Sequence, residues 1–258
     1  MLRGANFTQC TFANISFKDT KLIDCQFSAC VFENCYFRKA TLRECNFPAS
    51  RFIDCELPKT RIHTCSLGTT RFQGTAPKYA VLEQSLPGEP NLCRDLCQNI
   101  ATEASALGYE REARRYRLRS IEEHEKALKR GFLWSDQYSR DHYPELERFR
   151  ALGAYVLSRA SGFLWGNGEF IRRLLLNLFG VAVLLGPLLL YLARDHLHGA
   201  DTYWDCLALS VACVLNATEI TGTSATGIAV PIMLLLSATG LLFLGLFITY
   251  LFQAVTRR

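Results

Sequence analysis

The sequence predicts a multidomain membrane protein in which a β-solenoid, a charged helical linker and two membrane-spanning helices follow one another along the chain. Three observations predict this order. A large apolar residue recurs at every fifth position near the N-terminus, charges crowd residues 108–130, and two long apolar stretches lie near the C-terminus. The near-zero mean hydropathy therefore averages a polar half and an apolar half.

The five-residue period runs without a miss through the first predicted domain, residues 1–75. A large apolar residue stands at every fifth position from Phe7 to Phe72, with a mostly small residue two places before each. A period of five fits neither a helix nor a strand. It fits a square coil in which each five-residue unit forms one side and both repeating residues point inward. The predicted core includes nine phenylalanines: Phe7, Phe12, Phe17, Phe27, Phe32, Phe37, Phe47, Phe52 and Phe72.

Residues 5–74 resemble the pentapeptide-repeat family, whose motif is A-(D/N)-L-x-x. Ala5-Asn6-Phe7 and Cys45-Asn46-Phe47 match this motif well. The resemblance implies a right-handed quadrilateral β-helix of about three and a half coils, roughly 15–20 Å long at the strand spacing of a sheet. It implies no chemistry, because the phenylalanine and cysteine ladders are core.

Seven of the eleven cysteines occupy the small-residue phase of the repeat. Met1-Leu2-Arg3-Gly4 runs straight into the repeats, so we expect no signal peptide. These features predict reduced, buried thiols in a cytosolic domain rather than a disulfide framework. Cys25, Cys30 and Cys35 fall on successive sides of the coil, which argues against a shared metal ion.

Charge and motifs exclude several function classes. A net charge of +5 is too small to predict nucleic-acid binding. No motif of a hydrolase, metalloprotease, nucleotide-binding enzyme or redox enzyme is present, so we expect neither catalysis nor a cofactor. His196 and His198 are too few to predict a metal site. Cys93 and Cys97 have the spacing of one helix face and predict packing.

The middle of the chain divides into three predicted segments. Pro77, Pro87, Gly88 and Pro90 indicate a linker over residues 76–90. Residues 91–130 predict a charged helical hairpin broken at Gly108, which serves either as a spacer or as a sensor that moves the membrane helices. Its apolar face is expected to hold Leu92, Leu96, Ile100, Ala104 and Leu107.

Residues 131–169 predict a helix that lies along the membrane surface. Leu146, Phe149, Leu152, Val156 and Leu157 alternate with charged residues at helical spacing. Trp165 follows, and tryptophan suits the headgroup region of a bilayer.

Two stretches in residues 170–258 predict transmembrane helices. Residues 171–193 and 228–252 are each long enough to cross a bilayer. Arg172 and Arg173 flank the first stretch, and Arg257 and Arg258 follow the second. The positive-inside rule places both termini in the cytoplasm, so we expect a multi-pass protein of the cell's inner (plasma) membrane.

The connection between these stretches predicts a re-entrant pore helix and a filter-like loop. Residues 204–215 are apolar but too short to cross a bilayer, and residues 216–224 supply polar groups, one carboxylate and a glycine. Irregular backbone at membrane depth persists only beside protein or a water-filled cavity.

This arrangement resembles the two-transmembrane pore domain of potassium-channel-like proteins. Trp204-Asp205 and Ser210 occupy the places of the aromatic-acidic entry and the pore-helix serine, and Gly240 to Gly245 matches the inner helix. The resemblance implies a homo-oligomer, with a tetramer favoured. No T-V-G-Y-G filter is present, so potassium selectivity does not follow. Alignment on Ser210 places the predicted selectivity filter at Asn216, Ala217, Thr218, Glu219 and Ile220.

The pore residues each have a second interpretation. Glu219 forms a ring of carboxylates in a symmetric oligomer, or it lies exposed in an outer loop. Gly240 and Gly245 bend a pore-lining helix, or they let helices pack closely. Phe247, Leu251 and Phe252 are candidates for a hydrophobic gate near the cytoplasmic end.

These features together predict an oligomeric, cation-conducting channel whose solenoid serves assembly, gating or docking of a cytoplasmic partner protein. Its other expected partners are copies of itself, membrane lipids and inorganic cations. The alternative is a membrane-anchored scaffold in which the hairpin only anchors and the solenoid binds a partner. A pentapeptide-repeat protein directed at topoisomerase would also fit the repeat, but the apolar half and the lack of an acidic surface argue against it.

Overall fold

The structure is a computed structural model that describes residues 1–133, 145–166 and 170–256. It divides into two compact units, Met1–Tyr155 and Val156–Arg258. The solenoid and the charged helices lie in the first unit. The apolar helices lie in the second.

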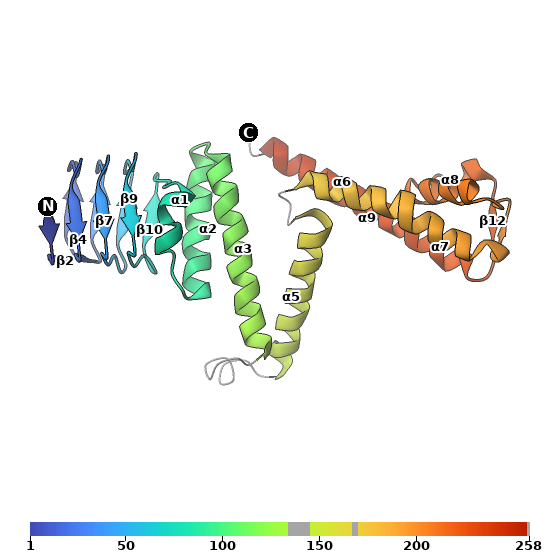
Figure 1. The fold of residues 1–258 in the computed structure, drawn as a ribbon, viewed down its shortest axis with the longest axis horizontal. Coiled ribbons are helices and arrows are strands. Elements are labelled where there is room, and N and C mark those ends of the chain that lie inside the picture. The colour runs from blue at the N-terminus through green and yellow to red at the C-terminus, as the bar shows by residue number, and fades with distance from the viewer. Residues whose placement is uncertain (134–144, 167–169, 257–258) are drawn as a thin grey trace. The chain divides into compact units, whose positions relative to one another are not determined.

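The solenoid consists of short parallel strands that stack into four sides (Figure 1). Each residue pairs with the residue twenty positions later, so Phe12 pairs with Phe32 and Phe32 with Phe52. Two sides are four-stranded sheets, β1-β4-β7-β9 and β3-β6-β8-β10. The third contains β2 and β5, and bridges between Ser16, Tyr36 and Glu56 mark the fourth. The strands are β1 (Leu2–Arg3), β2 (Asn6–Thr8), β3 (Thr11–Ala13), β4 (Lys21–Ile23), β5 (Gln26–Ser28), β6 (Val31–Glu33), β7 (Thr41–Arg43), β8 (Arg51–Ile53), β9 (Arg61–His63) and β10 (Arg71–Gln73).

Stacked phenylalanines form the core of the solenoid, as predicted. The ring centroids of Phe12 and Phe32 are 5.0 Å apart, and those of Phe32 and Phe52 are 4.8 Å apart. Six of the nine predicted phenylalanines are buried. Phe7, Phe12 and Phe17 are half-buried, because the first coil has a neighbouring coil on one side only.

The small-residue ladder satisfies backbone carbonyls inside the coil. The Cys35 thiol donates to the Phe12 carbonyl at 3.1 Å, and the Ser50 hydroxyl donates to the Phe27 carbonyl at 2.6 Å. All eleven cysteines are free, and the six of the ladder from Cys25 to Cys65 are buried. The prediction of packed thiols is confirmed for the ladder. A hydroxyl can replace a thiol there because it makes the same bond.

The solenoid continues beyond the boundary predicted at residue 75. The Thr75 hydroxyl accepts from the Cys55 amide at 2.8 Å, and the Ser85 hydroxyl accepts from the Cys65 amide at 3.1 Å. Between them, α1 (Tyr79–Leu82) and η1 (Glu83–Ser85) close the end of the coil with a fully buried Leu82. Residues 76–85 are therefore part of the folded solenoid and not a linker.

The predicted helical hairpin is α2 (Pro90–Ala106) and α3 (Glu110–Leu133). Gly108 turns the chain with a left-handed φ of 78°. Leu96, Ile100 and Ala104 are buried as expected. Leu92 and Leu107 were wrongly placed on this face, because they are 38% and 44% exposed. Cys93 and Cys97 are buried in place of these two leucines. The periodicity of large apolar residues did not indicate them, because a thiol is small.

Side chains from the hairpin fasten it to the last coil. The Asn99 side chain accepts from the Phe72 amide at 2.8 Å and donates to the Phe72 carbonyl at 3.0 Å. The Tyr116 hydroxyl donates to the Pro77 carbonyl at 3.1 Å, and burial raises the pKa of Tyr116. The Glu122 carboxylate and the Lys126 ammonium form an i,i+4 ion pair within α3, at 2.9 Å.

Helix α5 (Glu145–Trp165) covers most of the described part of the predicted interfacial region, whose first three residues belong to α3. Phe149, Leu157 and Phe163 are each at least 70% exposed. A helix that exposes such side chains suits an apolar surrounding. The predictions for residues 131–169 that fall on 134–144 and 167–169, and those for the side chains of Leu146 and Trp165, lie outside the described residues.

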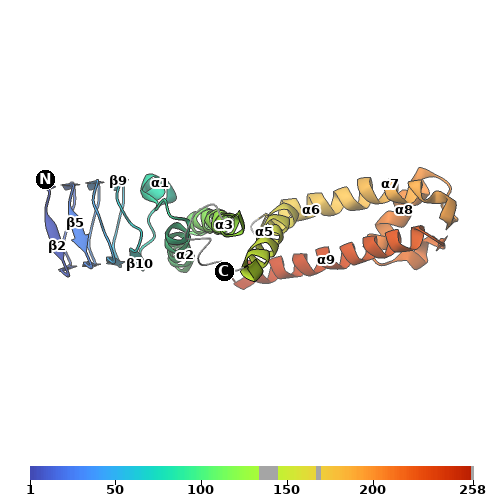
Figure 2. The ribbon, with the colours of Figure 1, turned by 90° about the horizontal axis from the view of Figure 1, so that it is seen from below.

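The second unit contains two helices long and apolar enough to cross a membrane, Ile171–Leu192 and Ala229–Phe252. The first is continuous through α6 (Ile171–Phe179), the π-helical η2 (Gly180–Leu185) and α7 (Gly186–Leu192). The second belongs to α9 (Ala229–Thr256). They run side by side, with the short α8 (Tyr203–Val214) between them at one end (Figure 2). Arg257 and Arg258 lie outside the described residues.

Candidate functional site

The candidate site is the segment from Thr202 to Gly227, which connects the two long apolar helices. Its first element, α8, begins at a capping box. The Thr202 amide donates to the Asp205 carboxylate at 2.9 Å, and the Asp205 amide donates to the Thr202 hydroxyl at 3.3 Å. Reciprocal bonds of this kind satisfy amides that the first turn of a helix leaves free. The helix predicted at 204–215 is therefore present.

Ser210 joins α8 to the π-helical part of the first apolar helix. Its hydroxyl donates to the Ala182 carbonyl at 2.9 Å, in a fully buried position. Within the π-helix, the Gly186 amide bonds to the Val181 carbonyl, five residues earlier. The corresponding donor for Ala182 would be residue 187, a proline without an N–H. Ser210 supplies the missing donor.

A left-handed asparagine ends α8 and holds it against α9. Asn216 has a φ of 54°, a conformation that asparagine adopts more readily than most residues. The Ala217 amide donates to the Ala212 carbonyl at 2.8 Å. The Ser237 hydroxyl on α9 donates to the Cys213 carbonyl at 3.1 Å, and the Asn216 side chain donates to the Ser237 carbonyl at 3.4 Å.

Of the five predicted filter residues, Thr218, Glu219 and Ile220 lie in a helical turn, η4 (Thr218–Thr221), and Asn216 and Ala217 precede it. The Ala217 carbonyl accepts from the Ile220 amide at 3.2 Å, and the Thr218 carbonyl accepts from the Thr221 hydroxyl at 2.8 Å. These two carbonyls are thus engaged within the turn rather than aligned as an extended row. Ala217 and Thr218 are half-buried, whereas Glu219 and Ile220 are exposed in the single chain.

A short antiparallel pair closes the base of the connection. Strand β11 (Leu197–His198), which follows η3 (Arg194–His196), pairs with β12 (Ser224–Ala225). The His196 carbonyl accepts from the Thr226 amide at 2.8 Å. Within the described residues, no group of three or more histidine, cysteine, aspartate or glutamate side chains gathers as metal ligands would.

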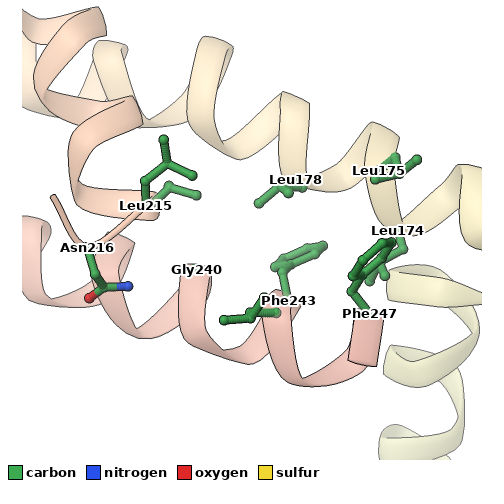
Figure 3. A pocket seen from close by; sticks show the side chains of 10 residues that line it. Leu174, Leu175, Leu178, Leu215, Asn216, Gly240, Phe243 and Phe247 are labelled. Atoms are coloured by element: carbon green, nitrogen blue, oxygen red, sulfur yellow. The ribbon is translucent and has the colours of Figure 1, made fainter. Parts of the chain in front are cut away.

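An apolar cavity of about 300 Å³ lies between α6, the end of α8 and α9 (Figure 3). Asn216 is at its α8 end and contributes the one polar side chain in its lining. Phe247, a predicted gate residue, is half-buried and lines the same cavity. The other lining residues are Leu174, Leu175, Leu178, Val214, Leu215, Gly240, Phe243 and Leu244.

The two glycines of α9 have different surroundings. A Cβ at Gly240 would overlap the Val214 carbonyl, so this glycine lets α8 and α9 approach closely. A Cβ at Gly245 would have open space. Helix α9 is uninterrupted at both, which favours the packing interpretation for Gly240. The remaining gate candidates, Leu251 and Phe252, are 46% and 69% exposed.

Several residues that build the site were not predicted. Thr202 could have been found from its T-x-x-D spacing to Asp205, which is typical of a capping box. Pro187 acts through a partner distant in sequence, and no local pattern indicates it. Ser237 was expected among the small residues through which this helix packs, but its hydrogen bond to Cys213 was not.

Comparisons with known proteins identify the solenoid. Residues 4–82 match the family model described as the pentapeptide repeat region. A solved structure of QnrB1, described as a plasmid-mediated fluoroquinolone resistance protein, aligns with 28% of this chain at 16% identity and a TM-score of 0.09. That alignment spans 65% of the QnrB1 chain. No curated protein matches the chain significantly.

Proposed function

We propose that this chain, a pentapeptide-repeat region followed by two apolar helices, is the subunit of an oligomeric cation channel. The two helices cross the membrane, and the segment from Thr202 to Gly227 lines the conduction path. The pentapeptide-repeat domain lies in the cytoplasm and serves assembly, gating or docking.

The observation that carries this proposal is the placement of α8. A capped helix too short to cross a bilayer is wedged between two helices long enough to do so. Two polar contacts, Ser210 to Ala182 and Ser237 to Cys213, join its C-terminal half to both apolar helices. A connection that served only as an anchor would not need a buried helix held in this way.

Glu219 supplies the charge that the proposal needs. It is exposed on the turn that follows α8. One hairpin cannot enclose a pore, so several copies must surround it. Their Glu219 carboxylates would then form a ring that attracts cations. Because the nearby carbonyls bond within the turn, we propose that charge, more than a carbonyl cage, discriminates between ions.

Reconstitution of the purified full chain in planar bilayers tests the proposal. We expect cation-selective single-channel currents from oligomeric protein. If pure, oligomeric protein gives no current over a wide range of voltages and cations, the proposal is wrong.

The role of Glu219 is tested by the substitution Glu219→Gln. We expect the ratio of cation to anion permeability to fall several-fold, because the ring loses its charge while its shape is kept. Asp201→Asn is the matched control, since it removes another exposed carboxylate from the same connection. Reversal potentials that shift equally in both variants would assign the effect to general surface charge.

A second candidate function is a membrane-anchored scaffold whose solenoid binds a partner protein. The helical turn at Thr218–Thr221 favours it, because the Ala217 and Thr218 carbonyls already have partners. The mass of the protein in nanodiscs separates the candidates: a channel requires several copies per particle, whereas one or two copies support the scaffold.

A further inference from the structure

One side of the solenoid carries no charge. It consists of residues 5–9, 25–29, 45–49 and 65–69, which the pairs Phe7–Phe27, Gln26–Asn46 and Asn46–Ser66 stack into one row. We call this the neutral side. The other three sides carry all fifteen Lys, Arg, Asp and Glu residues found between positions 5 and 74. Each of the other three sides therefore carries charge, and this side carries none.

The outward residues of the neutral side are small or carry amides and hydroxyls. Asn6, Gln26 and Asn46 form an exposed ladder, beside the exposed Ala29 and Pro48. The fourth rung is partly covered within the first unit, since the Leu92 side chain lies 3.2 Å from the place of a Cβ on Gly68. The first three rungs form the accessible part of this surface.

We infer that the neutral side is a contact between two copies of this chain, related by a two-fold axis. In such a contact the same patch lies opposite itself, so a residue near the axis lies close to its own copy. A charge at that place would be repelled by its like, and the neutral side has no charge to place there.

The hydrogen-bonding chemistry favours a second copy over an unrelated partner. Asparagine and glutamine side chains each present donors and an acceptor, so a ladder of amides is complementary to an identical ladder. An acidic or basic partner would instead be attracted to the charged sides. The neutral side also avoids the desolvation of ions that burial of a charged side would require.

The contact is small and depends on tethering. Three rungs spaced about 4.8 Å apart offer much less than the roughly 800 Å² per partner of a stable interface. Copies held in one membrane assembly have a high effective concentration, which makes a weak contact sufficient. The pairing thus rests on the proposed function, in which several copies assemble in one membrane. Within that assembly the solenoids associate in pairs rather than as a continuous ring.

Cross-linking of the full chain in nanodiscs tests this pairing. Gln26 lies on the middle accessible rung, so a two-fold contact brings it near its own copy whichever way the rungs run. We expect Gln26→Cys to give disulfide-linked dimers under mild oxidation, with no larger species. Tyr36→Cys is the control, because it has the same place in the repeat on the opposite side of the same coil. The wild type gives the background of the native thiols. Equal dimer yields from both variants, or a ladder of larger species, would overturn the inference.

A charge exchange tests whether the surfaces are identical. In the Gln26→Cys background, we expect Ser28→Asp and Ser28→Lys each to lower the dimer yield several-fold, because like charges then face each other. Mixing the two variants in one membrane should restore the yield. Yields that do not fall, or that fall without restoration in the mixture, contradict a self-facing contact.

The failure of this inference is distinguishable from failure of the proposed function. Particle mass in nanodiscs reports how many copies assemble, independently of the solenoid contact. An oligomer without Gln26→Cys dimers disproves the pairing and leaves the channel. A single copy per particle removes both.

Discussion

The solenoid and the segment between the apolar helices satisfy their polar groups in opposite ways. In the solenoid, one relation repeats: a thiol or hydroxyl donates to the carbonyl twenty-three residues earlier, as for Cys35, Ser50 and Thr60. Between the apolar helices, each contact occurs once, such as Ser210 with Ala182. Periodicity makes a structure predictable from sequence, and it leaves little of the coil's interior free for chemistry. The unique contacts are where we expect function.

The largest effect should follow from Phe32→Ala. Phe32 is fully buried and stacks on Phe12 and Phe52, so its removal leaves a cavity along the ladder. We expect a loss of about 3–5 kcal/mol in the free energy of unfolding, measured by hydrogen exchange of peptides from the solenoid. Phe12→Ala, in the half-buried first coil, should cost clearly less. Equal losses would show that the coils do not differ in burial as described.

Ser50 tests the small-residue ladder. Its hydroxyl donates to the Phe27 carbonyl and accepts from the Cys30 amide, both buried. Ser50→Ala leaves both groups without a partner and should cost about 1–3 kcal/mol in the same exchange experiment. Ser50→Cys should cost less, because a cysteine occupies this place in the previous coil. If alanine and cysteine are equally tolerated, the ladder acts by volume alone.

The two glycines of α9 should respond with opposite signs. Gly240→Ala forces a methyl group against the Val214 carbonyl and should cost about 1–3 kcal/mol. Gly245→Ala meets open space and should stabilise the helix by up to about 1 kcal/mol in the single chain. Thermal unfolding in nanodiscs measures both. A neutral Gly240→Ala would argue against close packing of α8 on α9.

Ser210 should give the smallest effect. Ser210→Ala removes the only donor that the structure provides to the Ala182 carbonyl among the described side chains, and it should cost about 1 kcal/mol. Thr249→Ala is the control, because the Thr249 hydroxyl bonds to the Gly245 carbonyl of its own helix. A thermal shift no larger than that of the control would mean that α8 is held by packing rather than by Ser210.

The sequence predicted most of the solenoid, because the five-residue period indicates which side chains point inward. Its end was predicted too early. Thr75, Pro77, Leu82 and Ser85 keep the same phases and are buried or half-buried, but prolines and the onset of helix concealed this continuation. The buried face of α2 was misjudged for a related reason: Cys93 and Cys97 fill close contacts that the leucine pattern did not indicate.

The candidate site was predictable only in outline. Length and apolarity indicated α8, since an apolar stretch of ten residues flanked by polar ones forms a short buried helix. The turn at Thr218–Thr221 and the cavity beside Asn216 depend on α6 and α9, which are distant in sequence. Local propensity carries no information about such contacts. For the same reason, the place of Glu219 in an oligomer stays a prediction.

The twenty-residue pairing of the coils has a consequence for how this domain can change over time. Duplication of a whole coil would lengthen the rod by about 4.8 Å and leave every later residue on its original side. Duplication of a single five-residue unit would instead turn everything after it by one side of the square. The neutral side would then be divided into two parts that lie on different sides of the coil. An insertion of five-residue units therefore preserves the surface only when it adds four units, or a multiple of four.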